Sequence, residues 1–264
     1  MPRYLDARSD VVFEKIFGRH SELLKSFLNA VLPLPQDCSI DSLTYLPIES
    51  DHKTERLISS VANVRCLDNH GCSFIVKIEL QWSTAVVEWN YFNATKPRAR
   101  KIEKEEVCRL LSPAYRLAII DDTFKQDCEL FHYYRMTNIC NEGKSLEDIQ
   151  LVLIELPKVS LTSITENRLA VLWIRFLKEI NEKTETVDSS LLEVKEIKEA
   201  LSLLEISSYS SAEYNAYERS WDAVSTLRTL LNGKFKEGFE KGKAKGKGEG
   251  KADAIRTGSN YMNR

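Results

Sequence analysis

Two strand-like segments joined by a tight turn constrain this chain most. Residues 57–67 and 73–81 carry branched and apolar side chains at close to alternate positions, which predicts two β-strands. Between them stands Asp68-Asn69-His70-Gly71, with Asp and Asn at the start of the turn and Gly at its end. The segment is therefore expected to form two neighbouring strands of a sheet.

The flanking segments predict an α/β core around this pair. A short helix is expected from Ser9 to a stop at Gly18, and a second one over 23–31 that Pro33 and Pro35 end. Further strands are predicted at 39–46, 115–120, 131–139 and 150–156, and a helix interrupted or restarted at Pro97 at 86–111. We expect a mixed sheet with helices before it and across it.

After Pro157 the pattern becomes purely helical. Apolar residues at the 3.6-residue period predict a helix over 169–180, the leucines between 191 and 204 predict one more, and 214–235 a third. The predicted division is a core at 1–157, a helical region packed on it at 158–232, and a Gly/Lys/Glu-rich tail at 233–264. The tail has glycine at every fourth position, which fits a marginal helix or a solvated tail.

Composition excludes several classes of protein. The 264 residues have a net charge of -2, so no overall basic field attracts nucleic acid, and such contact has to come from local patches. The sequence lacks a secretory h-region and any run of about 18 apolar residues, which predicts no membrane span. Six cysteines without a CxxC motif argue against a zinc ribbon and favour reduced, structural thiols in the cytoplasm.

The second strand carries an unusual row of polar residues. Period-2 geometry places Lys77, Glu79 and Gln81 on one face, while Asn63 and Arg65 stand on the preceding strand. Carboxylates on two adjacent strands would hold a hard cation such as Mg²⁺, with Lys or Gln orienting the attacking water. Glu79 supplies one carboxylate, and Asn63 stands where the second is needed. The alternative interpretation is a half-solvated strand with its polar side chains outward.

Scattered motifs in a fixed order indicate ancestry. They comprise Arg3-Tyr4-Leu5-Asp6, Ser9-Asp10-Val11-Val12-Phe13-Glu14-Lys15-Ile16-Phe17-Gly18, the stretch from Leu23 to Pro33, the stretch from Val64 to Gly71, Phe74-Ile75-Val76, Phe92-Asn93-Ala94-Thr95-Lys96, Ile154-Glu155-Leu156-Pro157-Lys158, Ala170-Val171-Leu172-Trp173 and Arg175-Phe176-Leu177-Lys178. On these motifs the chain resembles the recombination-promoting nuclease and transposase family of the PD-(D/E)xK superfamily. The resemblance runs from about residue 3 to residue 181.

The resemblance implies both a fold and a chemistry. The fold is an α/β, restriction-endonuclease-like core with a mixed sheet, followed by a helical region. The activity is that of a DNA endonuclease of recombination or mobile elements, in which water activated by Mg²⁺ or Mn²⁺ hydrolyses a phosphodiester bond. The implied metal ligands are Glu79 and Asn63, and Lys77, Gln81 and Asp10 complete the catalytic set. DNA is the implied partner, without a membrane or a small-molecule cofactor, and a homo-oligomer is left open.

The departures from the family pattern fall on this chemistry. The family has Asp where this chain has Asn63, and Glu-x-Gln where this chain has Lys77-Ile78-Glu79. Alternatively, Glu79-Leu80-Gln81 is the Glu-x-Gln motif moved by two residues, which preserves its face. Asn63 offers a carbonyl oxygen without charge, and Lys77 would repel a cation.

Two further features have alternative interpretations. Asp10 is either a carboxylate that lines the site or a helix-start charge favoured by the helix dipole. A local basic cluster either contacts DNA phosphates or forms a solvated helix face; it comprises Lys96, Arg98, Arg100 and Lys101.

Two functional hypotheses follow from the sequence. The first is a metal-dependent DNA endonuclease, a hydrolase with an eroded catalytic motif. The second is a catalytically inactive relative that binds DNA or a protein partner, which Asn63 and Lys77 motivate. Metal-independent, salt-sensitive DNA binding would distinguish the second from the first.

Overall fold

The computed structural model describes residues 3–46, 59–81, 114–123, 126–138, 141–159 and 167–226, together with residues 229, 230, 233 and 241. The chain divides into two units, Met1–Trp221 and Asp222–Arg264. The sheet and the helices named below belong to the first unit, and the described residues of the second unit are helical. The predicted helix at 86–111 lies outside the described residues.

Six strands form one mixed sheet in the part of the chain that the structure describes, in the order β1-β2-β3-β4-β6-β5. They are β1 (Ile40–Tyr45), β2 (Ser59–Asp68), β3 (Ser73–Gln81), β4 (Ala114–Ile120), β5 (Phe131–Asn138) and β6 (Asn141–Glu155). β4 is parallel to both of its neighbours, β3 and β6, whereas the remaining pairs are antiparallel. The predicted mixed sheet is confirmed.

The turn between β2 and β3 has the chemistry that its residues predict. The Asp68 carboxylate accepts hydrogen bonds from the backbone N–H groups of His70 (2.9 Å) and Cys72 (2.8 Å). Gly71 has φ = 79°, a left-handed conformation that costs glycine little because it has no Cβ. This local turn fixes the alignment of the two strands that carry the polar row.

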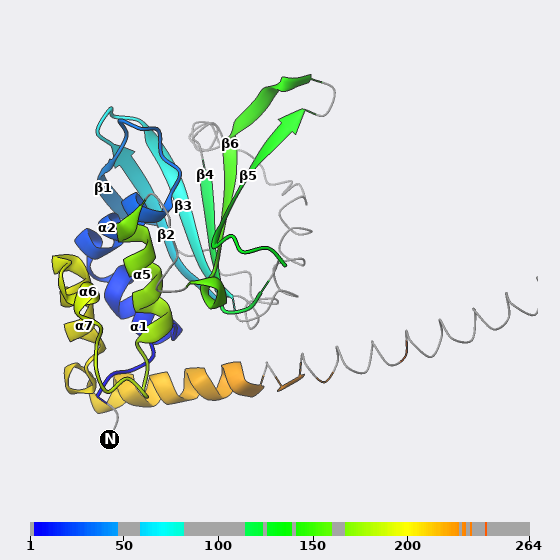
Figure 1. Ribbon diagram of the computed structural model, residues 1–264. Helices are drawn as coiled ribbons and strands as arrows, with labels where there is room; N and C mark the ends of the chain where they lie inside the picture. Colours follow the sequence, from blue (N-terminus) through cyan, green and yellow to red (C-terminus); the bar gives the residue numbers. More distant parts are fainter. Residues whose placement is uncertain are drawn as a thin grey trace, which may run out of the picture. The chain divides into compact units, whose positions relative to one another are not determined.

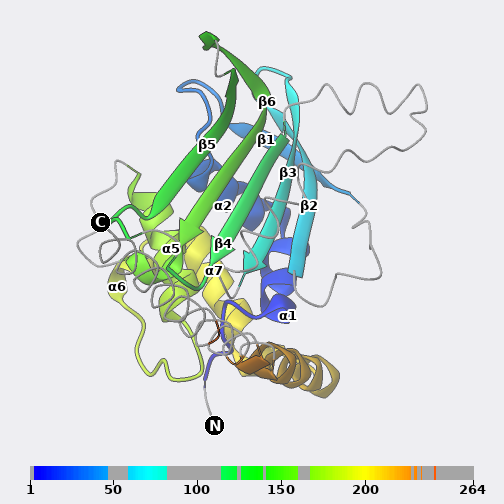
Figure 2. The same ribbon diagram turned by 90° about the vertical axis from the view of Figure 1, so that its right-hand side faces the viewer.

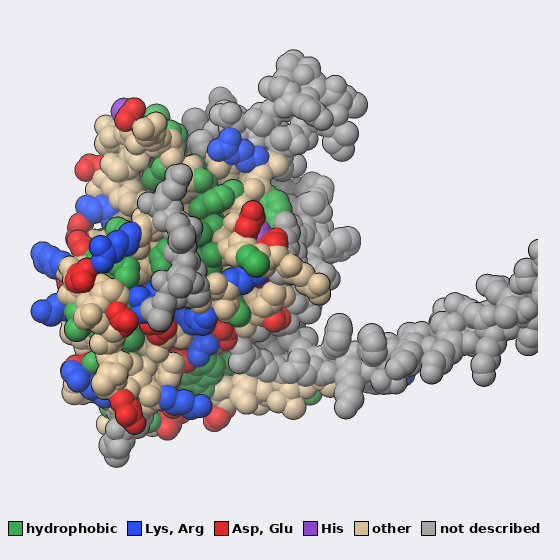
Figure 3. Space-filling view, in the orientation of Figure 1, with side chains coloured by type: hydrophobic (Ala, Val, Ile, Leu, Met, Phe, Trp, Pro, Cys, Tyr) green, Lys and Arg blue, Asp and Glu red, His purple; other side chains and the backbone are tan. Residues whose placement is uncertain are grey.

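Helices cover one face of the sheet (Figures 1 and 2). They are α1 (Asp10–Phe13), which continues into a π-helical turn at Glu14–Gly18, then α2 (Ser21–Val31), α5 (Arg168–Glu179), α6 (Ser189–Leu192) and α7 (Lys195–Leu204). Charged side chains of both signs stand on the surface of the helical layer (Figure 3). Among the described helices, none combines the length and apolar character that a bilayer crossing requires.

Local signals set where these helices begin and end. α2 ends at Val31, since Leu32, which precedes a proline, takes an extended conformation. The Asn167 side chain accepts a hydrogen bond from the N–H of Ala170 at 3.2 Å and so caps the start of α5.

The prediction of one helix between residues 191 and 204 is wrong. α6 ends at Leu192 and α7 begins at Lys195, with Val194 in an extended conformation between them. The leucines are spaced too widely to require a continuous helix. β6 also begins at Asn141 rather than near residue 150, because its polar first half pairs with β5 without an apolar alternation to mark it.

An aromatic cluster connects the helices beneath the sheet. The ring of Phe17 lies 5.0 Å from that of Phe27 and 5.5 Å from that of Trp173, and Trp173 lies 5.6 Å from Phe176. All four side chains are fully buried in the same core as the inner residues of the strands. The helix-covered face of the sheet is therefore apolar, and the opposite face combines polar side chains with a smaller apolar cluster of Ala118, Ile120 and Leu153.

We expect Trp173→Ala to lower the free energy of unfolding by about 3–5 kcal/mol, because the cavity it leaves can collapse only in part. Urea denaturation followed by circular dichroism measures the change. The control is Leu192→Ala, whose side chain is 45% exposed and whose loss should cost below about 0.5 kcal/mol. Equal stabilities of the two variants would contradict the assignment of Trp173 to the core.

Candidate functional site

The face of the sheet opposite the helices carries the polar residues. Val76 and Ile78 of β3 belong to the core, so Lys77 and Glu79, which alternate with them, point to the other side. The same alternation places on this face Asn63 and Arg65 of β2, Arg116 of β4 and Glu155 of β6.

Three of these side chains stand in one row across three strands. Asn63 of β2 is the cross-strand partner of Lys77 of β3, and Lys77 is the partner of Arg116 of β4. Neighbouring strands are about 4.8 Å apart, so long side chains in one row can reach a common partner. The row brings together Asn63 and Lys77, both predicted, with Arg116, which the sequence did not single out.

Glu79 is the common partner of the two cations. The Arg116 Nη2 atom lies 2.8 Å from Glu79 Oε1, and the Lys77 Nζ atom lies 3.1 Å from the same oxygen. Glu79 has no exposed surface, whereas the side chains of Lys77 and Arg116 are 44% and 28% exposed. Burial alone would raise the pKa of Glu79, but Arg116 and then Lys77 outweigh it and hold that pKa below its ordinary value. Glu79 is therefore a carboxylate at neutral pH.

The other predicted site residues are placed differently. Asp10 begins α1 and is the acidic residue of its first turn, as the dipole interpretation requires, and its role in the site stays a prediction. Gln81 ends β3, where it pairs with Ile120, but its side chain lies outside the described part of the chain. The same holds for the whole of the predicted basic cluster, Lys96, Arg98, Arg100 and Lys101.

A second buried carboxylate, Glu155, lies at the end of β6. Its Oε1 atom is 2.6 Å from His132 Nε2 and 2.9 Å from Lys158 Nζ. Lys158 also lies 2.6 Å from Asp127, whose pKa this hydrogen bond lowers. Asp127, Glu129 and His132 are close enough to share a metal ion, yet Lys158 already places a cation there. The signal in the sequence that could have indicated this ion pair is Glu155 at the end of a predicted strand with Lys158 three residues later.

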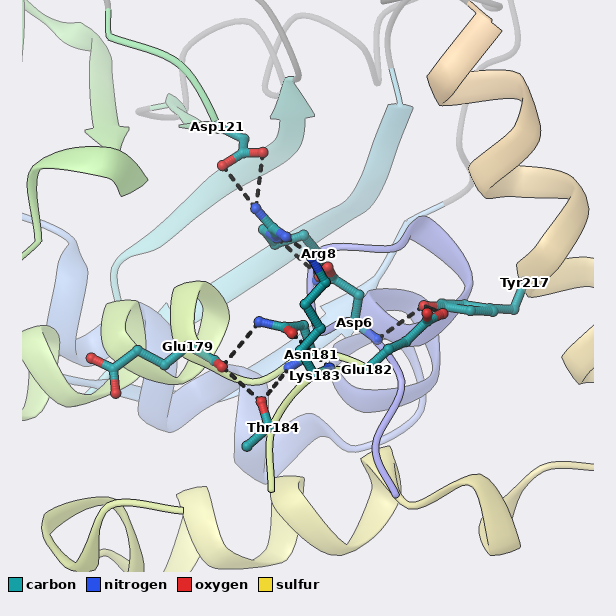
Figure 4. Close-up of polar contacts among 9 residues, drawn as sticks. All are labelled: Asp6, Arg8, Asp121, Glu179, Asn181, Glu182, Lys183, Thr184 and Tyr217. Atoms are coloured by element: carbon teal, nitrogen blue, oxygen red, sulfur yellow. Dashed lines mark hydrogen bonds and ion pairs between the residues drawn. The ribbon is translucent and has the colours of Figure 1, made fainter. Parts of the chain in front are cut away.

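Arg8 connects the N-terminal segment with the end of β4 (Figure 4). Its guanidinium donates to both oxygens of Asp121 at 3.0 Å and to Asp6 at 2.9 and 2.7 Å. Burial alone would lower the pKa of Arg8, but the two carboxylates raise it, so the charge is fixed. Tyr217 extends the network, accepting from the backbone N–H of Asp6 at 3.1 Å and donating to Glu182 at 2.7 Å.

The match to known proteins covers most of the chain. Residues 7–232 match the family described as PD-(D/E)XK nuclease family transposase. The chain belongs to this family. A search of curated proteins and a search of solved structures gave no match. Membership in the PD-(D/E)XK family confirms the resemblance that the scattered motifs carry, and the mixed sheet with its helices agrees with the α/β fold of the family.

PD-(D/E)XK nucleases generally use divalent metals, and the described residues around Glu79 fit such an ion poorly. Lys77 and Arg116 contribute two positive charges and Glu79 one negative charge, which leaves a net charge of +1. Asn63 adds an uncharged amide. Binding of Mg²⁺ depends on carboxylate ligands. Here the Oε1 atom of Glu79 already contacts the charged groups of Lys77 and Arg116.

Arg116→Ala should lower the free energy of unfolding by about 2–3 kcal/mol, less than the roughly 3–5 kcal/mol for stranding a buried charge, because Lys77 still contacts Glu79. Urea denaturation measures the loss. Adding Glu79→Gln to this variant should restore part of the stability, since it removes the poorly compensated charge. The matched control is Arg168→Ala, which breaks an exposed ion pair to Glu193 and should cost below about 1 kcal/mol.

A cost for Arg116→Ala as small as that for Arg168→Ala would show that the Glu79 carboxylate does not depend on Arg116.

Proposed function

We propose that this chain is a DNA-binding member of the PD-(D/E)XK transposase family in which metal-dependent cleavage is lost. The family name associates the fold with nucleases and transposases, and DNA is the substrate that this association indicates. The observation that carries the loss of cleavage is the double ion pair of Glu79 with Lys77 and Arg116.

Hydrolysis by a metal-activated water needs a metal cation bound at the site. Lys77 and Arg116 would compete with that cation for the Glu79 carboxylate. A dication that reached Glu79 would meet an ammonium 3.1 Å and a guanidinium group 2.8 Å from the same oxygen. Asn63 cannot offset this repulsion, because its amide has no charge. Binding of a DNA backbone is favoured by the same charges, since Lys and Arg are the usual partners of phosphate oxygens.

DNA binding is tested by fluorescence anisotropy with a labelled duplex in buffer that contains EDTA. We expect binding that weakens steeply as salt is added, because phosphate contacts release counterions. The absence of binding at low salt would reject the proposed function.

Cleavage is tested by incubating supercoiled plasmid with the protein and Mg²⁺ or Mn²⁺. We expect no nicking by the wild type and a gain of Mg²⁺ binding in Asn63→Asp/Lys77→Glu, which places carboxylates on two facing strands. Isothermal titration calorimetry measures the metal affinity of both proteins. Nicking by the wild type that Glu79→Gln abolishes would instead identify an active nuclease, as the first hypothesis from the sequence has it.

A further inference from the structure

We propose that Lys77 and Arg116 together bind one phosphate of the DNA backbone at the position where the family resemblance implies a metal ion, so that the site needs no divalent cation. This inference rests on the proposed DNA-binding function and names the chemistry of the same site. It converts a site for a cation into a site for an anion.

The row of donors across the strands is the first support. Asn63, Lys77 and Arg116 are cross-strand neighbours on β2, β3 and β4, and they offer an amide, an ammonium and a guanidinium group. All three can donate hydrogen bonds to oxygen. Such a row matches the oxygens of a phosphate group, whereas a metal ion requires acceptors.

Unused donor capacity is the second support. Glu79 accepts from one nitrogen of each cation, while an ammonium has three N–H bonds and a guanidinium has five. Within the described part of the chain, the Nε–H of Arg116 is buried and has no hydrogen-bond partner. Because Lys77 is 44% exposed and Arg116 is 28% exposed, both retain accessible surface beyond Glu79.

Charge balance is the third support. The cluster of Lys77, Arg116 and Glu79 has a net charge of +1, which a phosphodiester with its single negative charge neutralises. A divalent cation would raise the local charge further. Glu79 acts here as a positioning residue, because it holds both cations from the buried side and does not face the anion itself.

Arg65 extends the same surface. It lies on β2 two residues from Asn63, on the same face of the sheet, and is partly buried. A backbone phosphate next to the one at Lys77 would lie within the reach of a long arginine side chain, so a DNA strand rather than an isolated phosphate fits the row best.

The test compares variants of the full chain in EDTA by anisotropy with a labelled duplex. Lys77→Met and Arg116→Gln should each weaken binding about tenfold or more, because each removes a charge-assisted hydrogen bond. Lys77→Arg keeps the charge and should retain most of the affinity. The matched control is Lys198→Glu, an exposed lysine of α7 on the helical side, which should change affinity within about twofold.

Two further arms identify the ligand. Inorganic phosphate should displace the duplex at an ionic strength where chloride does not, and this difference should disappear in Lys77→Met. Adding Mg²⁺ should weaken binding no more than its ionic strength explains. Thermal denaturation of each variant checks that the proteins compared are folded.

The outcomes separate this inference from the proposed function. Wild-type DNA binding that Lys77→Met and Arg116→Gln leave unchanged would overturn the inference and preserve the function. Binding that requires Mg²⁺ would also overturn it, since a metal would then occupy the site. A wild type that does not bind the duplex at low salt would reject the proposed function and this inference with it.

Discussion

Glu79 is a charged group without exposed surface, and a buried charge is stable only with partners close to it. Its partners are Lys77 on the same strand and Arg116 on the parallel neighbour β4. Two cations on one carboxylate oxygen keep Glu79 ionised and tie β3 to β4 through side chains as well as backbone. They also give the three side chains together a net charge of +1, which disfavours a divalent cation beside them.

The two faces of the sheet differ, and this difference explains why Glu79 and its two cations lie on the face opposite the helices. Helices α1, α2, α5 and α7 lie on one side of the sheet, and the aromatic cluster of Phe17, Phe27, Trp173 and Phe176 is part of the apolar core on that side. Polar side chains of the central strands therefore gather on the opposite face. There the alternation of each strand determines which residues point to this face, and the pairing between strands determines which of them lie side by side in one row.

Carboxylates paired with the protein's own cations recur at the ends of the three parallel strands. Glu79 of β3 has Lys77 and Arg116, Asp121 after β4 has Arg8, and Glu155 of β6 has His132 and Lys158. Parallel strands place these ends along one edge of the sheet. This edge is rich in acids, yet each of these three carboxylates already contacts a positively charged group of the protein.

Local patterns in the sequence were enough for the turn at Asp68, for the strand from Ser73 to Gln81, and for the face that Lys77 and Glu79 share. These features depend on residues close together in the chain. Arg116 could not be predicted in the same way, because it contacts a carboxylate 37 residues earlier in the sequence. His132 and Glu155, 23 residues apart, meet for the same kind of reason.

The sequence by itself determined the family and the mixed sheet, and it placed the uncharged Asn63 on the strand next to Lys77 and Glu79. Only the tertiary structure decided that Arg116 joins Lys77 on Glu79, and so that this cluster of three side chains has a net positive charge. The physical reason is strand order. Alternation along a strand determines which face of the sheet a residue occupies. Which residue it contacts on that face depends on which strand lies beside it, and β4 lies beside β3 only in the folded sheet.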